Sequence, residues 1–221
     1  MGHGGVDLLG GRRLDRHQRR AHNVLDPAQP RQGVFRPAQA RLDEQRLVQR
    51  HQPILKLQRL VINRMLALKK EHGLDTICIY CNSMSTAIDL TDVAAETGLK
   101  IVTPLEVYRL AADQYRTIGL MAANCQSLAG IEKVIQEQNE AAQVIGAAML
   151  EIAIEIEQKT DPRQIVRSLG LVNLIRFFEA ADVEVLVLGC THFPYLQSTL
   201  EGLTSLPILN PAAEMVRLCQ T

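Results

Sequence analysis

Two cysteines stand where a thiol could move a proton. Cys81 follows the apolar run TICIY and Cys190 follows the run VLVLG, and in both cases small polar residues and the start of a helix come next. A cysteine just before a helix N-terminus faces unpaired backbone N–H groups and the positive end of the helix dipole. Both lower the pKa of a thiol and favour the reactive thiolate. The two segments therefore predict a pair of acid/base thiols.

Two thiols on opposite faces of one carbon atom suit the racemisation of an amino acid. One thiol, as thiolate, removes the α-proton, and the other delivers a proton to the opposite face. The anion that forms must be stabilised by fixed dipoles. Asn82, Ser83 and Thr191, together with nearby backbone N–H groups, can hold the substrate carboxylate. This scheme requires no metal and no pyridoxal cofactor.

The cysteine count favours a reduced protein. Five cysteines are an odd number for a disulfide framework, so we expect a cytoplasmic protein with free thiols. Cys78 lies three residues before Cys81 inside a strand pattern and on its opposite face, which argues against a redox pair. We expect Cys125 and Cys219 to be packing residues. A zinc site would need two close pairs of ligands, which the sequence does not offer.

The cysteines depend on strands and helices that alternate from about residue 55 onward. Short apolar runs predict strands at 76–80, 100–103, 117–123, 143–149, 183–189 and 206–210. Helical patterns lie at 56–73, 85–98, 104–115, 127–142, 162–181, from about 194, and at 211–219. Such alternation predicts βαβ units with parallel strands, an α/β fold. Ligands bind such sheets beyond the carboxyl ends of the strands.

The N-terminal segment, residues 1–54, differs from the α/β region 55–221. Residues 1–60 carry 12 basic and 5 acidic residues, a net charge of +7, whereas residues 61–221 carry 12 basic and 19 acidic residues, a net charge of −7. Three interpretations remain open. The segment is a disordered basic tail, a nucleic-acid-binding arm, or a stretch that is not the native sequence of this domain, as a wrong reading frame through a GC-rich gene would give. The lack of interleaved aromatic residues argues against the arm.

Composition excludes several classes of protein. No stretch approaches the roughly 18 apolar residues that span a bilayer, and the N-terminus lacks an apolar signal region, so we expect neither a membrane protein nor a secreted one. The formal net charge is zero, which gives no general attraction to nucleic acid. The expected partner is a small amino-acid substrate.

The two cysteine motifs resemble those of the aspartate/glutamate racemase superfamily, and those of glutamate racemases in particular. The segment LGCTHFPYL closely matches the second-cysteine motif of that family, and CNSMS is similar to the first. The two cysteines are 109 residues apart, close to the family's separation. The resemblance runs from about residue 60 to residue 218.

The resemblance implies a fold of two pseudo-symmetric parallel-sheet lobes with the active site between them. One lobe would comprise residues 55–115 and 206–221, and the other residues 116–205. Cys81 and Cys190 would be the catalytic pair, with His192 assisting the second cysteine. The residues that would bind the substrate are Asn82, Ser83, Thr191, Asn124 and Glu157. The resemblance also implies a homodimer and a role in supplying D-glutamate for peptidoglycan.

The sequence also departs from the family. Glutamate racemases begin with a strand and an Asp-Ser-Gly turn, whereas this chain has GVDLLGG, so the first βαβ unit is atypical or missing. Thr191-His192 favours glutamate as the substrate, while Met84 resembles aspartate-type members. Two alternatives to a glutamate racemase therefore remain. One is an aspartate or broad-specificity racemase, and the other is a catalytically impaired racemase-like binding protein.

Overall fold

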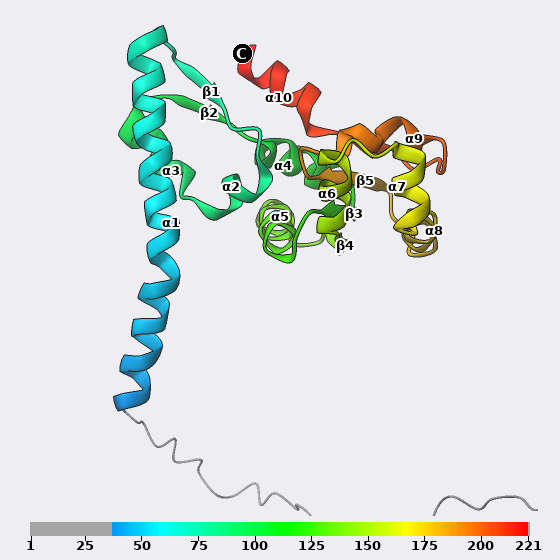
Figure 1. Cartoon of the computed structure of the whole chain (residues 1–221), viewed down its shortest axis with the longest axis horizontal. Helices are drawn as coiled ribbons and strands as arrows, with labels where there is room; N and C mark the ends of the chain where they lie inside the picture. The colour runs from blue at the N-terminus through cyan, green and yellow to red at the C-terminus, as the bar shows by residue number, and fades with distance from the viewer. Residues whose placement is uncertain (1–36, 221) are drawn as a thin grey trace, which may run out of the picture. The chain divides into compact units, whose positions relative to one another are not determined.

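The computed structural model describes the backbone of residues 37–220 and the side chains of residues 53–220 (Figure 1). Apart from the start of the first helix, the described elements belong to one compact unit, Glu44–Thr221. Our three interpretations of the N-terminal segment concern mainly residues outside the described part. Helix α1 spans Pro37–His72, so it begins well before the predicted start at 56. It ends at Gly73, whose φ of +64° gives the left-handed conformation common at helix ends.

The strands form two parallel sheets, which confirms the predicted α/β class. In the first sheet β1 pairs with β2, and the second sheet has the order β4-β3-β5-β6. The strands are β1 (Thr76–Cys78), β2 (Lys100–Val102), β3 (Thr117–Ala122), β4 (Gln143–Ala148), β5 (Val185–Gly189) and β6 (Ile208–Leu209).

Helices connect the strands much as the sequence patterns predict, with two breaks. The helices after α1 are α2 (Asn82–Ala87), α3 (Leu90–Thr97), α4 (Pro104–Gln114), α5 (Cys125–Gln138), α6 (Leu150–Glu157), α7 (Pro162–Ser168), α8 (Leu171–Ala180), the 3₁₀ turn η2 (Phe193–Leu196), α9 (Gln197–Glu201) and α10 (Pro211–Gln220). Asp89 divides the expected helix 85–98, because its side chain accepts hydrogen bonds from the first N–H groups of α3. Gly170, with a φ of +67°, divides the expected helix 162–181. Helix α6 was not predicted.

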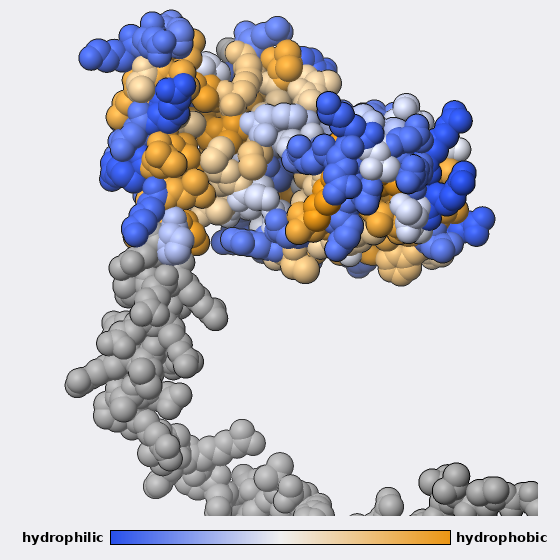
Figure 2. Space-filling view, viewed as in Figure 1, coloured by the Kyte–Doolittle hydropathy of each residue, from blue (hydrophilic) through white to orange (hydrophobic). Residues whose placement is uncertain are grey.

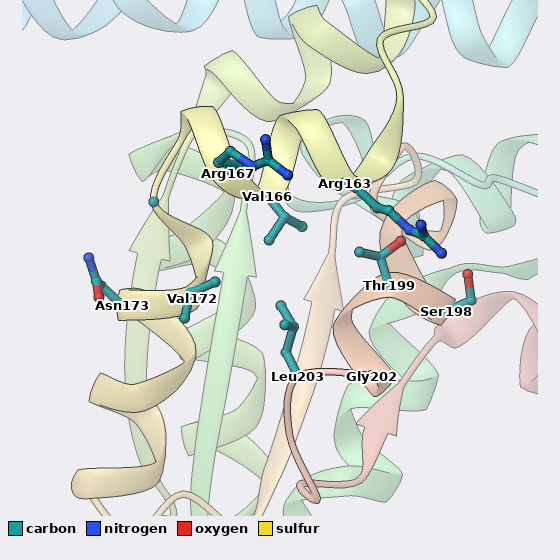
Figure 3. Close-up of a pocket in the computed structure, with 10 residues that line it drawn as sticks. Arg163, Val166, Arg167, Val172, Asn173, Ser198, Thr199, Gly202 and Leu203 are labelled. Carbon is teal, nitrogen blue, oxygen red and sulfur yellow. The ribbon is translucent and has the colours of Figure 1, made fainter.

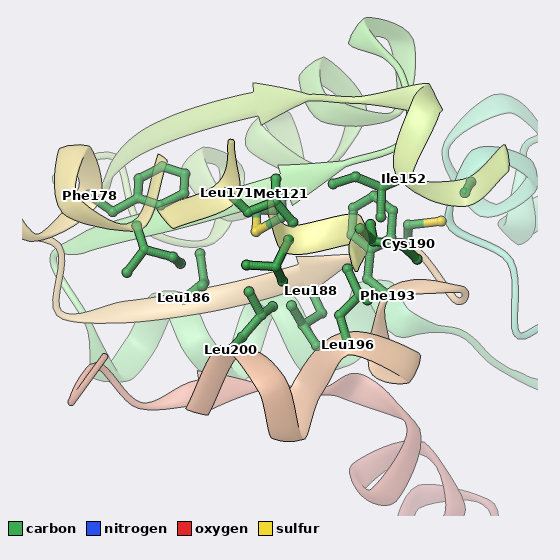
Figure 4. Close-up of a cluster of buried hydrophobic side chains, with 14 of the residues drawn as sticks. Met121, Ile152, Leu171, Phe178, Leu186, Leu188, Cys190, Phe193, Leu196 and Leu200 are labelled. Atoms are coloured by element: carbon green, nitrogen blue, oxygen red, sulfur yellow. The ribbon is translucent and has the colours of Figure 1, made fainter. Parts of the chain in front are cut away.

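The second sheet forms the main core. Every residue of β5 is buried, as expected for a parallel strand that is covered on both faces. One face packs against α6 to α9, with Leu186 and Leu188 at its centre (Figure 4). The opposite face packs against α4 and α5, where Leu120 and Tyr108 are fully buried. This rigid slab fixes the carboxyl end of β5, where Cys190 lies.

The first sheet is smaller and less deeply buried. Its strands are three residues long, and the cluster above it is formed by side chains of α1, α3 and the loops, among them Ile62, Met65 and Val93. Apolar side chains of this region remain at the surface (Figure 2), including Leu55 and Leu60 of α1, which are 61% and 67% exposed. The first sheet therefore gives its strand ends weaker support than the second.

The C-terminal segment divides between the two sheets. Strand β6 pairs with β5, Ile208 opposite Leu186, so our assignment of all of 206–221 to the first lobe is wrong for this strand. Helix α10 instead contacts α4, β1 and β2. Cys219 of α10 forms a disulfide with Cys78 of β1. We expected Cys219 to be a packing residue. Helix α10 packs against β1, which brings these two cysteines together.

Candidate active site

The carboxyl ends of β1, β3 and β5 surround one cavity of about 200 Å³. Seven of the eight predicted site residues line it: Cys81, Asn82 and Ser83 after β1, Asn124 after β3, and Cys190, Thr191 and His192 after β5. The remaining wall comes from Ala123, Leu150, Ala153 and Gly189. Residues far apart in the sequence thus meet at one edge of the parallel strands, as the strand pattern predicts.

Cys190 is held at the end of the most buried strand. Gly189 precedes it because a Cβ at that position would lie 2.7 Å from Leu120 Cδ1 and 2.8 Å from the carbonyl oxygen of Met121. Cys190 is 8% exposed, and burial raises the pKa of its thiol above the ordinary value. The N–H of His192 opposes this shift, whereas the nearby Cys81 adds to it. The predicted lowering of the Cys190 pKa is therefore wrong, because desolvation outweighs the backbone N–H groups.

His192 links Cys190 to a carboxylate. Its Nδ1 lies 3.6 Å from Cys190 Sγ, and its Nε2 lies 2.6 Å from Glu157 Oε1. Glu157 does not line the cavity itself but reaches His192 from the end of α6. A carboxylate beside Nε2 favours the tautomer that carries its proton there, which leaves Nδ1 free to face the thiol. The geometry thus forms a Cys–His–Glu chain from the cavity to the solvent.

Cys81 has a different environment. It is half-buried, and its backbone conformation is extended where α2 begins. Its carbonyl oxygen accepts hydrogen bonds from the N–H and the hydroxyl of Ser85, which fixes the turn. Within the described residues, no side chain forms a hydrogen bond with its sulfur. Cys81 therefore has no counterpart of His192.

Two further residues that sequence reasoning missed hold the polar wall in place. The hydroxyl of Tyr108 donates to Asn82 Oδ1 at 2.6 Å, and the hydroxyls of Ser127 and Ser83 lie 2.7 Å apart. Asn124 caps α5 by accepting a hydrogen bond from the N–H of Ser127. Ser127 could have been noticed as the first serine after the β3 strand end. Nothing in the sequence around Tyr108 indicates its partner.

A larger hollow of about 610 Å³ lies elsewhere, between α7, α8 and α9 (Figure 3). Val166, Val172 and Leu203 line it beside the polar side chains of Arg163 and Thr199. None of the predicted site residues reaches this hollow, so size alone does not locate the chemistry.

In the part of the chain that is described, no group of three or more His, Cys, Asp or Glu side chains is placed to hold a metal ion. No described helix is long and apolar enough to cross a membrane.

Comparison of the sequence with known proteins relates this chain to racemases. The family model for Asp/Glu/hydantoin racemases matches residues 15–219. A glutamate racemase of Gloeobacter violaceus is 32% identical over 154 residues, which cover 66% of this chain and 56% of that protein. A glutamate racemase of Latilactobacillus sakei is 26% identical over 159 residues, which cover 68% and 57%. The chain therefore spans little more than half the length of these relatives.

Solved structures show the fold. The glutamate racemase of Francisella tularensis in complex with D-glutamate has a TM-score of 0.60 at 16% identity and covers 75% of this chain and 62% of that one. The Escherichia coli glutamate racemase, solved with L-glutamate and an activator, has a TM-score of 0.57 at 18% identity and covers 74% and 64%. With a family model that matches nearly the whole sequence, the chain belongs to the Asp/Glu/hydantoin racemase family.

Proposed function

We propose that the chain interconverts L- and D-glutamate by proton transfer between two thiols and the α-carbon. The observation that carries this proposal is that Cys81 and Cys190, which follow strands of different sheets, line the same cavity together with side chains that can donate hydrogen bonds. The curated relatives named above, both glutamate racemases, support glutamate as the substrate.

The reaction needs one proton to leave and one to arrive. A thiolate on one side takes the α-proton and becomes a thiol, and the electron pair moves toward the substrate carboxylate. The opposite thiol then gives its proton to the other face of the α-carbon and becomes a thiolate. The product has the inverted configuration, and the two thiols have exchanged their protonation states.

The electrostatics of the pair favour one thiol and one thiolate. Cys81 raises the pKa of Cys190 because two negative charges in one small cavity repel each other. Burial raises the pKa of Cys190 further, which favours its thiol form over its thiolate. The singly protonated pair is the form that racemisation in either direction requires, and its two pKa values belong to the pair as a whole.

Polar groups around the cavity would bind the substrate and stabilise the anion. Asn82, Ser83, Asn124 and Thr191 supply neutral donors, while the chain from Glu157 to His192 can assist proton transfer at Cys190. The sequence Thr191-His192 favours glutamate over aspartate by its resemblance to glutamate racemases. Supply of D-glutamate for peptidoglycan is part of the proposal on the same ground.

Incubation with each enantiomer of glutamate and aspartate in D₂O tests the proposal. We expect the α-proton signal in the NMR spectrum to disappear for both enantiomers of glutamate and the optical rotation to fall to zero. Exchange of both enantiomers of aspartate at equal or higher kcat/KM would instead identify an aspartate or broad-specificity racemase. The Cys81→Ser variant controls for a contaminating racemase, because it should racemise glutamate at least about 10²-fold more slowly than the wild-type protein.

The same experiment separates an enzyme from an impaired binding protein. Glutamate that shifts protein NMR signals but shows no α-proton exchange over a day would indicate binding without turnover. Folded protein that neither binds nor exchanges any of the four acids would refute the proposed function. Both outcomes require a melting transition as a check that the protein is folded.

A further inference from the structure

We propose that Tyr108 is a positioning residue for substrate binding, which orients the carboxamide of Asn82 so that its N–H₂ group faces the substrate carboxylate. This inference rests on the proposed racemase function and assigns a role to a residue outside the cavity lining. Asn82 borders the cavity directly after Cys81. Tyr108 stands behind it, on a different element of the fold.

The position of Tyr108 is fixed by α4. Thr103 and Glu106 form a capping box at the start of this helix, and Pro104 occupies its first position. One turn later, Tyr108 is 0% exposed and packs in the cluster between α4, α5 and the second sheet. Burial raises the pKa of Tyr108 far above its ordinary value, so its hydroxyl stays protonated and remains a donor at any pH at which the protein would work.

That hydroxyl selects one of the two orientations of the Asn82 carboxamide. Tyr108 donates at 2.6 Å to Asn82 Oδ1, and rotation of the carboxamide by half a turn would leave the buried hydroxyl proton without this acceptor. Asn82 is 3% exposed, so water does not easily compensate a wrong orientation. Tyr108 therefore holds Oδ1 and leaves Nδ2 without this partner.

Asn82 Nδ2 has no hydrogen-bond partner, and it is the one buried side-chain nitrogen or oxygen atom in this condition among the described residues. An unsatisfied buried donor is unfavourable to folding, so a persistent one calls for a functional explanation. The residue lines the same cavity as the two cysteines, where a negatively charged acceptor has to bind for racemisation. The carboxylate of the amino-acid substrate is such an acceptor.

The test compares Tyr108→Phe with the wild-type protein in the exchange assay. The ring is retained and the O–H is lost, so Asn82 can rotate, and we expect KM for both enantiomers of glutamate to rise about 3- to 30-fold. We expect kcat to change by less than about threefold, because the interaction acts on the bound substrate as well as on the transition state. Tyr115→Phe is the matched control. It removes a hydroxyl at the end of the same helix that makes no hydrogen bond with a described residue, and it should leave KM unchanged.

A double-mutant cycle distinguishes positioning from general support. In an Asn82→Ala background, Tyr108→Phe should no longer change KM, since there is no carboxamide to orient. An equal rise in KM with and without Asn82 would overturn the inference, and so would an unchanged KM in Tyr108→Phe. If the single variant unfolds, the next measurement still tests the inference, because it uses the wild-type protein.

The NMR signal of the Asn82 side-chain N–H₂ group provides that measurement. Its two protons, identified by their absence in Asn82→Ala, should shift when either enantiomer of glutamate saturates the wild-type protein. Glutamate that shifts other signals but leaves this pair unmoved would overturn the inference and leave the proposed function intact. Absence of both binding and exchange would refute the proposed function, and the role of Tyr108 with it.

Discussion

The two strand ends that carry the cysteines have similar sequences but different surroundings. Cys190 ends a fully buried strand in the middle of a four-stranded sheet, and His192 connects it to Glu157. Cys81 follows a three-residue strand in a two-stranded sheet, and no described side chain forms a hydrogen bond with its sulfur. Cys190 therefore has a hydrogen-bonded histidine and a rigid core around it, whereas Cys81 is half-buried on a smaller sheet.

This difference indicates that the two sides of the cavity have different roles. On the side of Cys190, the fold supplies groups that can exchange protons. On the side of Cys81, it supplies fixed neutral dipoles, because Asn82 is held by Tyr108 and Ser83 by Ser127. A symmetric reaction does not require symmetric surroundings, provided that each thiol can take either protonation state. The predictions below test whether the two sides depend on each other in this way.

The largest expected effect is the loss of either thiol. Cys81→Ser and Cys190→Ser should each lower the rate of racemisation by about 10²- to 10⁴-fold, the range for a positioned acid or base. Each variant should still exchange the α-proton of the one enantiomer that faces its remaining thiol, and the two variants should prefer opposite enantiomers. NMR in D₂O measures both rates. Cys125→Ser, which removes an exposed free thiol, is the control. Equal preference in the two variants would contradict the two-sided arrangement.

The next effect concerns the two sheets. Leu188→Ala in β5 should lower the free energy of unfolding by about 2–5 kcal/mol, because the side chain is fully buried and leaves a cavity. Ile77→Ala in β1 should cost less, since Ile77 is only half-buried. Urea denaturation followed by circular dichroism measures both. A larger loss for Ile77→Ala would mean that the first sheet, despite its short strands, carries the stability of the fold.

Much of the fold was predictable because its signals are local. The run VLVLG is continuous and apolar, and such a run can form a strand only where both faces are covered, as in β5. The breaks at Asp89 and Gly170 were missed, although both residues are common at helix ends, because the apolar period continues across them. Helix α6 was missed because its run IAIEIE alternates like a strand.

The candidate site was predictable to the extent that strand ends define it. Seven residues in the loops after three strands meet at the cavity because parallel strands place their carboxyl ends together. The pKa of Cys190 was not predictable, because burial depends on the whole core and here outweighs the helix end. Nor was the contact of Tyr108 with Asn82, since 26 residues separate them and only the packing of α4 brings them together.

A smaller effect should follow when the charge at the end of the Cys–His–Glu chain is removed. Glu157→Gln keeps the size of the side chain but removes the charge beside His192 Nε2, so we expect kcat/KM to fall about fivefold to tenfold. The effect is limited because Glu157 is largely exposed and solvent weakens the interaction. Glu151→Gln, on the exposed first turn of the same helix, should have no effect and serves as the control. An unchanged kcat/KM in Glu157→Gln would mean that Cys190 and His192 transfer protons without help from Glu157.

The smallest effect is a change in the pKa of Cys190 when Cys81 is removed. Cys81 raises this pKa by repulsion, so in Cys81→Ser the pKa of Cys190 should fall. It should nevertheless stay above the ordinary value, because burial is the larger cause and remains. The rate of alkylation by iodoacetamide against pH gives the value when Cys125 is also replaced by serine, since Cys190 is then the sole remaining free thiol among the described residues.

The pH dependence of kcat/KM also reports the ionisation of the two thiols. Because the equilibrium constant of racemisation is one, kcat/KM of the two enantiomers must follow the same curve, and we expect a bell whose limbs report the two ionisations of the thiol pair. At low pH activity falls as the thiolate is protonated, and at high pH it falls as the second thiol ionises. The raised pKa of Cys190 moves the second limb to higher pH. If Cys81→Ser leaves the pKa of Cys190 where it was, the thiols do not interact, and the high-pH limb must then be attributed to burial alone.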